Sequence, residues 1–165
     1  MAALTSTNLR VWKGQLETKK CLILNGQSWK AGQLLRQNTS GLLTVVASNH
    51  VAATGGNIYM ALSDQADPGN STTYALVAVV TADTIFLGNE YDTTATAASI
   101  GQDAGVNVAS NICTVDISAG ASYPFFRVVG VLSAEVEPCM NDSADTKARL
   151  LVKVLTTIIE ATPQA

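Results

Sequence analysis

Short alternating runs of apolar and polar residues are the feature that most constrains how this chain folds. Val, Thr, Ala, Ile and Gly recur in runs of a few residues, and clusters such as Asn25-Gly26 and Asp67-Pro68-Gly69-Asn70 separate them. A period of two residues indicates a β-strand, and Gly, Asn, Asp and Pro clusters indicate turns. A helical pattern is present only weakly, over 93–100. The chain is therefore predicted to be all-β, as a small β-barrel or β-sandwich.

Two runs near the C-terminus give the clearest strands. Over 149–160, Leu150, Val152 and Val154 share one face, and Arg149 and Lys153 share the other. The run 126–137 alternates in the same way, and its internal Gly130 predicts a bulge or bend. Further strands are expected at 20–24, 32–37, 42–47, 57–62, 73–80, 84–87 and 112–117.

The composition predicts a single folded domain with a partly covered surface. The chain has 165 residues, of which 47% are hydrophobic, enough to form a core. Only 14% are charged, against about a quarter in a typical soluble domain, so we expect partners to cover part of the surface. No apolar run reaches the roughly 18 residues of a membrane span, and the N-terminus does not resemble a secretory signal. Synthesis in the cytoplasm is expected, with Cys21, Cys113 and Cys139 as reduced thiols or with one disulfide bridge among them.

Positive charge is concentrated at the start of the chain. Six of the ten Lys and Arg residues lie in the first 36 positions, and the stretch 37–126 has none but carries seven acids. This distribution favours docking onto a larger acidic surface. The first 19 residues carry Arg10 and Lys13 around Trp12 and lack sustained alternation. We expect an extended arm over 1–19 before a domain over 20–165, with a frayed terminus or an edge strand as alternatives.

Candidate catalytic and metal-binding residues are few. The sole histidine, His50, has no accompanying GxSxG or cysteine signature, so it is interpreted as a solvated loop residue. Asp64, Asp67 and Asn70 offer oxygen ligands for Ca²⁺, but they lack the closing Glu of an EF-hand and fit a turn.

The chain also contains a pair of neighbouring acids and a Gly-Gly turn. Glu90 and Asp92 flank Tyr91, a pattern compatible with glycoside hydrolysis, but solvated loop acids are the simpler interpretation. Gly55-Gly56 lacks the Lys-Ser/Thr of a P-loop. A pI of about 5.0 disfavours nucleic-acid binding. We therefore expect no catalytic residue, no metal, no cofactor and no enzymatic activity.

Several segments of the chain carry a resemblance to a known protein family. They are the run 30–35, the Asn38–Leu42 turn, 57–62, 83–89 and the late strand 125–131. Over residues 20–160 the chain resembles the β-barrel head decoration (cement) proteins of tailed bacteriophages. The resemblance implies a β-tulip-like fold.

The resemblance also implies a function. It implies a structural virion protein, often a homotrimer, that binds the major capsid protein on the capsid exterior and stabilises contacts between capsomers, without nucleic acid or membrane. The positions matched to a capsid-binding arm are Leu9, Arg10, Val11, Trp12, Lys13, Lys19 and Lys20. The alternative is a β-sandwich module that binds carbohydrate or another polymer. A β-barrel hydrolase is a third interpretation, for which we find no polar constellation.

Overall fold

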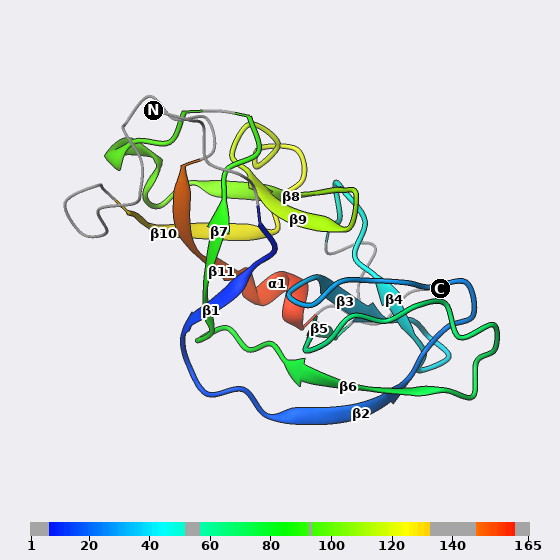
Figure 1. The fold of residues 1–165 in the computed structure, drawn as a ribbon. Helices are drawn as coiled ribbons and strands as arrows, with labels where there is room; N and C mark the ends of the chain where they lie inside the picture. Colours follow the sequence, from blue (N-terminus) through cyan, green and yellow to red (C-terminus); the bar gives the residue numbers. More distant parts are fainter. Residues whose placement is uncertain (1–6, 52–56, 93, 133–147, 161–165) are drawn as a thin grey trace.

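The computed structural model of the chain describes residues 7–51, 57–92, 94–132 and 148–160, and within them the protein is all-β. Two antiparallel sheets make up the fold (Figure 1). In spatial order, the six-stranded sheet consists of β1 (Arg10–Lys13), β7 (Ile85–Asn89), β11 (Arg149–Val154), β10 (Phe126–Val131), β8 (Asp103–Ala109) and β9 (Ile112–Asp116). The five-stranded sheet consists of β2 (Thr18–Leu22), β6 (Tyr74–Val79), β5 (Ile58–Ala61), β3 (Leu34–Gln37) and β4 (Leu43–Val45).

Both sheets curl, but neither closes into a barrel. In the five-stranded sheet, the residue after β2 bridges the opposite edge, where Ile23 pairs with Leu43 of β4. In the six-stranded sheet, Glu90 after β7 bridges Val115 of β9. Each curl therefore brings distant strands of one sheet together at a single point. The all-β prediction is confirmed, in its sandwich-like form.

Two buried clusters follow from this curvature. The main core lies between the sheets and contains residues of both, including Met60 of β5 and Phe86 of β7. A second cluster, around Trp29, fills the concave side of the five-stranded sheet. Because successive side chains in a strand point to opposite faces, β5 contributes to both clusters and all four of its residues are buried.

The two C-terminal strands agree with their predicted patterns. On β11, Leu150, Val152 and Val154 are buried, while Arg149 and Lys153 are half-buried. The pairing of β10 with β11 shifts register between Val128 and Gly130, which confirms the predicted bulge. The remainder of the predicted strand, 133–137, lies outside the described residues.

The prediction that the last strand continues to Glu160 is wrong. The strand ends at Val154, and a single helical turn, α1 (Thr156–Ile159), follows. Leu155, Ile158 and Ile159 all pack against the main core. Their spacing of i, i+3 and i+4 is helical, so one turn of helix buries all three on the same side.

The remaining elements differ from the predictions in two places. The seven other predicted strands are present with ends within two residues of those expected. However, β8 was not predicted, and neither was its tight hairpin with β9 through Ser110 and Asn111, both at positive φ. The weak helix expected over 93–100 is a 3₁₀ turn, η2 (Ala97–Ser99).

The cysteines behave as reduced thiols in the described part of the chain. Cys21 and Cys113 are free, buried, and located in different clusters. Burial raises the pKa of Cys113 to about 12, and it also raises the pKa of Cys21. Both thiols are therefore neutral and poorly reactive at physiological pH. Cys139 lies outside the described residues.

Candidate binding surface

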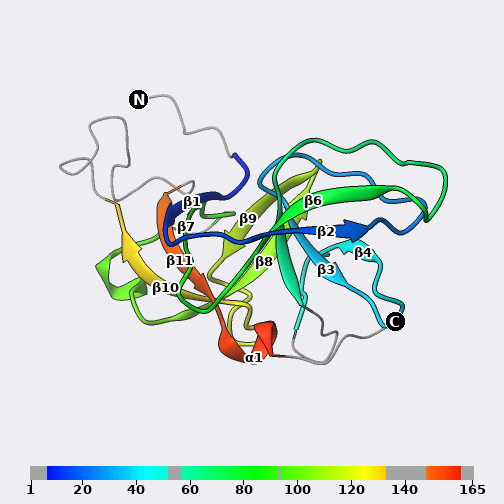
Figure 2. The same cartoon turned by 90° about the horizontal axis from the view of Figure 1, so that it is seen from below.

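Residues 10–22, called the strap below, join the two sheets along one side of the molecule. Its first part is β1, the edge strand of the six-stranded sheet, and its last part is β2, the edge strand of the other. Seen from below, the strap runs across the molecule from one sheet to the other (Figure 2). The link between the two strands is attached to the five-stranded sheet as well, since the Glu17 backbone carbonyl accepts a 2.8 Å hydrogen bond from the Val79 amide.

The strap begins with a bulge that exposes a tryptophan. The pairing of β1 with β7 shifts register between Val11 and Lys13, which leaves Trp12 as the extra residue. Trp12 is 44% exposed. Bulges at sheet edges redirect side chains and interrupt pairing, and this one directs the indole away from the core.

Within the described part of the chain, the strap carries positive charge that no ion pair compensates. Arg10, Lys13, Lys19 and Lys20 are all exposed, against one acid, Glu17. The ion pairs of the described residues are Lys30–Asp64 and Arg127–Asp103, and neither involves the strap.

The two lysines of β2, Lys19 and Lys20, point to opposite faces of the strand. The Lys20 ammonium lies 5.4 Å from the centre of the Tyr74 ring. On the neighbouring strand β6, Lys20 pairs with Leu76, and both Tyr74 and Leu76 are 54% exposed. Lys19 instead lies 5.7 Å from the centre of the Tyr59 ring, which belongs to the second cluster. Consecutive strand residues point to opposite faces, so the predicted pair does not form one basic patch.

The N-terminal segment is part of the folded body from Thr7 onward. Leu9 is 2% exposed and lies in the main core, and Val11 packs against that core. The Asn8 side chain accepts a 2.7 Å hydrogen bond from the Cys113 amide and donates a 3.0 Å bond to the Asn111 carbonyl. In the described residues the predicted arm is therefore the edge strand that was its alternative, and Leu9 and Val11 are structural residues.

The acidic stretch is less exposed than its composition suggests. Of its seven acids, Glu90 and Asp116 are buried, and Asp64 and Asp103 are in the two ion pairs. The Lys30 ammonium lies 2.7 Å from Asp64, and hydrogen bonds from it and from the Ala31 amide lower the pKa of that carboxyl.

The predicted turn over Asp67–Asn70 is confirmed by its hydrogen bonds. Asp67 accepts bonds from the Gly26 and Gly69 amides, and Asn70 accepts bonds from the Thr72 amide and hydroxyl. These contacts account for both side chains as loop-stabilising groups.

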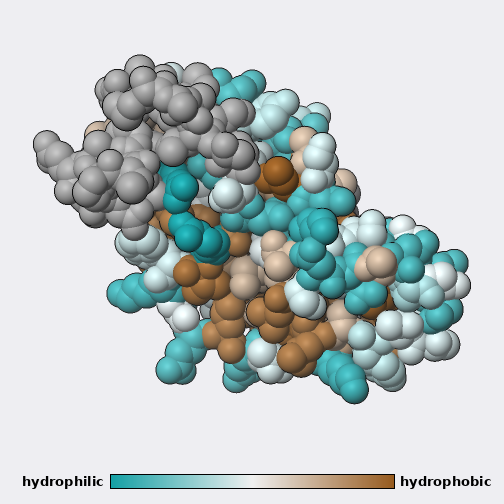
Figure 3. Space-filling model, in the orientation of Figure 1, coloured by the Kyte–Doolittle hydropathy of each residue, from teal (hydrophilic) through white to brown (hydrophobic). Residues whose placement is uncertain are grey.

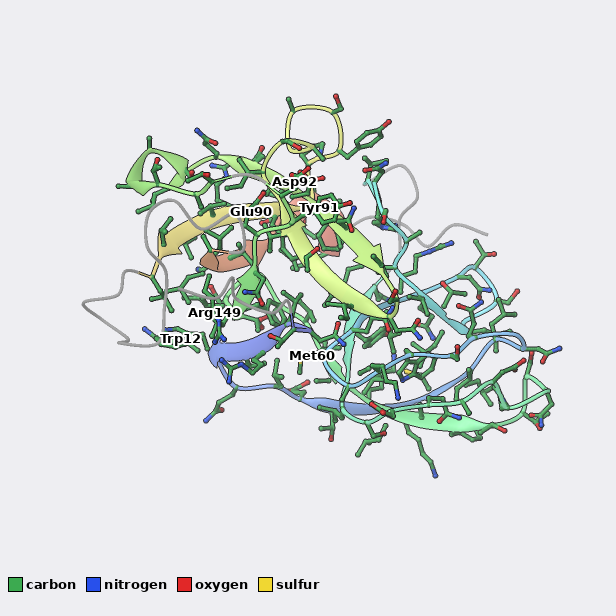
Figure 4. All side chains as sticks on the ribbon, turned by 45° about the horizontal axis from the view of Figure 1, so that its top comes forward. Trp12, Met60, Glu90, Tyr91, Asp92 and Arg149 are labelled. Carbon is green, nitrogen blue, oxygen red and sulfur yellow. The ribbon has the colours of Figure 1, made fainter. Side chains whose placement is uncertain are left out.

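A cluster of three carboxylates forms near the end of β7, where Asp116 joins the pair Glu90 and Asp92 that the sequence singles out. Oxygens of Glu90, Asp92 and Asp116 lie within 4.8 Å of one another, and Figure 4 shows Glu90, Tyr91 and Asp92 together, well apart from Trp12. Glu90 accepts from the Ile117 amide at 3.2 Å, and Asp116 accepts from the Ser118 hydroxyl at 2.6 Å. Glu90 is fully buried, so its interpretation as a solvated loop acid is wrong; the bridge to β9 draws it inward. Hydrogen bonds hold Glu90 and Asp116 in this arrangement, and the three carboxylates offer hard oxygen ligands of the type that Ca²⁺ prefers.

His50 is also buried, contrary to its interpretation as a solvated residue. It is 4% exposed, and its ring meets that of Phe125 edge to face at 5.5 Å. Burial, and secondarily the positive charge of Arg36, lower the pKa of His50 to about 4. The imidazole is therefore neutral in the folded protein near neutral pH.

Acid is expected to destabilise the protein through His50. In the unfolded chain the pKa returns to about 6.5, so protonation favours unfolding between pH 6.5 and 4. A pKa difference of about 2.5 corresponds to a loss of about 3 kcal/mol across that window. Urea unfolding of the protein and of the His50→Gln variant from pH 7 to 4 measures the effect. A parallel pH dependence in the two proteins would show that His50 is not responsible.

Comparison of the chain with protein-family models, curated proteins and solved structures finds no match. In the part of the chain that the structure describes, no helix has the length and apolar character to cross a membrane.

Proposed function

We propose that this protein is a structural protein that attaches to a larger assembly through the strap, and that the assembly is the exterior of a phage capsid. In this proposal the partner is the major capsid protein, and the protein acts as a homotrimer in the virion. The capsid and the trimer follow from the resemblance of the sequence to phage decoration proteins. The structure of the strap supports its use as the attachment surface.

The observation that carries the proposal is the combination of Trp12 with cations on two edge strands that form no ion pair among the described residues. A tryptophan raised by a bulge offers a large apolar surface, and Arg10 and Lys13 beside it attract an acidic partner. Lys20 adds a cation next to exposed Tyr74. Repeated copies on a lattice would multiply a modest affinity per site, as multivalent binding requires.

A carbohydrate-binding role has less support. Such sites need neighbouring aromatic rings that form a flat platform. Among the described residues, the exposed aromatic side chains are Trp12, Tyr74 and Tyr123, which come from β1, from β6 and from the segment before β10. Tyr123 belongs to neither part of the strap. No enzymatic role is proposed.

Attachment is tested by light scattering of the purified protein and by co-sedimentation with expanded phage heads that lack their decoration protein. A trimer that pellets with the heads supports the proposal, and we expect added salt to release it. A monomer that stays in the supernatant at low salt would overturn it.

The contribution of the strap is tested by Trp12→Ala. Attachment would bury the indole of Trp12, so its loss should weaken the binding free energy by about 2 kcal/mol, or the affinity per site by roughly thirtyfold. The melting temperature should change little, because Trp12 is not a core residue. Tyr123→Ala is the matched control, since Tyr123 is 40% exposed outside the strap. Equal affinities of the two variants for phage heads would show that the strap is not part of the interface.

A further inference from the structure

We propose that a groove between α1 and the strands β5 and β6 binds a small carboxylic acid with a short apolar body. The groove has a volume of about 460 Å³. Val79, Val80 and Ile159 form apolar parts of its lining, and Lys19, Tyr59 and Glu160 bring polar groups to it. Figure 3, drawn in the orientation of Figure 1, shows apolar residues gathered over this part of the molecule.

A chain of hydrogen bonds positions the Lys19 ammonium at the groove. Tyr59 is 2% exposed, and its hydroxyl donates to Gln37 Oε1 at 3.2 Å. The Asn57 amide approaches the same oxygen at 3.5 Å. Because the Tyr59 proton is used in this way, the phenol oxygen accepts from the Lys19 ammonium, at 3.4 Å. The Lys19 ammonium therefore lies beside the Tyr59 ring, while the residue as a whole stays exposed.

The fixed ammonium retains donors for a ligand. An ammonium group has three N–H donors, and the bond to Tyr59 uses one of them. Neither ion pair of the described residues includes Lys19. A carboxylate in the groove would accept from the remaining donors, and its apolar body would lie along Val79, Val80 and Ile159.

Glu160 makes it possible to test which charge the ligand of the groove carries. This exposed residue follows α1 and lines the same groove. A bound carboxylate would be attracted by Lys19 and repelled by Glu160, whereas a bound amine would experience the opposite forces. Lys19 belongs to the strap, but Trp12, Arg10 and Lys13, whose replacement tests attachment to a capsid, do not line the groove, so the two proposals are tested separately.

The test is a titration of the methyl-labelled protein with hexanoate, hexanamide and hexylammonium, followed by NMR. We expect hexanoate to shift the methyl signals of Val79, Val80 and Ile159 with saturation. Hexanamide and hexylammonium should bind at least tenfold more weakly, in line with the strength of a hydrogen bond between charged groups.

Three variants provide the controls. Lys19→Gln should weaken hexanoate binding about tenfold, and Glu160→Gln should strengthen it severalfold. Lys13→Gln should leave it unchanged, because this exposed strap cation does not line the groove. The proposal is overturned if hexanoate causes no saturable shift at these methyl groups. It is also overturned if hexanamide binds equally well or if Lys19→Gln binds hexanoate as the unmodified protein does.

Discussion

Replacing Val152 and Val154 together with aspartate is expected to prevent folding. Both valines are on β11, the third strand of the six-stranded sheet, and they are 0% and 2% exposed. They pair with Phe86 of β7 and Phe126 of β10, and all four side chains lie in the main core. An unpaired carboxylate in such a place costs several kcal/mol, and a domain has only about 5–15 kcal/mol of stability.

A matched substitution separates burial from the effect of the new charge. Val129→Asp places the same change on β10, where Val129 is 37% exposed, so the destabilisation should stay below about 1 kcal/mol. Circular dichroism and thermal melting measure both variants. A cooperative melt of the Val152→Asp, Val154→Asp protein near the unmodified temperature would mean that this face of β11 is not in the core.

The strands could be predicted from the sequence because their faces have different solvent exposure. On β11 the alternation of Leu150, Val152 and Val154 with Arg149 and Lys153 reports the burial of one face directly. Gly130 marked the bulge, because a missing side chain in the middle of a strand is a local signal. Patterns of this kind depend on neighbours in the sequence, and they need no knowledge of the tertiary fold.

The burial of His50 and Glu90 could not be predicted in this way. Both follow strands in polar segments, and polar segments usually lie on the surface. Glu90 is buried because the curl of the six-stranded sheet brings β9 against the end of β7. The hairpin at Ser110 and Asn111 was missed because it lacks the Asn-Gly or Asp-Gly pair typical of such turns.

The edge strand in the N-terminal segment could not be predicted from the sequence for a related reason. Leu9 and Val11 face the core, but the bulge at Trp12 breaks the alternation after only two apolar residues. A four-residue edge strand with three exposed side chains then resembles an unstructured basic arm. The candidate surface residues Arg10, Trp12 and Lys13 were found from composition, whereas the structural role of Leu9 needed the fold.

Deletion of residues 2–19 is accordingly expected to abolish folding rather than to release an arm. The deletion removes β1, Leu9 and the first two residues of β2, Thr18 and Lys19, and so takes an edge strand from one sheet and shortens the edge strand of the other. Loss of a buried leucine alone typically costs about 2–5 kcal/mol. It also removes Asn8, whose side chain bonds to Cys113 and Asn111. Expression followed by thermal melting gives the readout.

The same measurement on a triple variant, Arg10→Gln, Trp12→Ala and Lys13→Gln, separates the two roles of this segment. These three side chains are exposed, so their replacement should leave the melting temperature within a few degrees of the unmodified value. If the strap is both a structural element and an attachment surface, the deletion fails to fold, while the triple variant folds and no longer binds phage heads. A deletion protein that melts cooperatively would instead mean that β1 contributes little to the fold and acts as the detachable arm that its composition suggested.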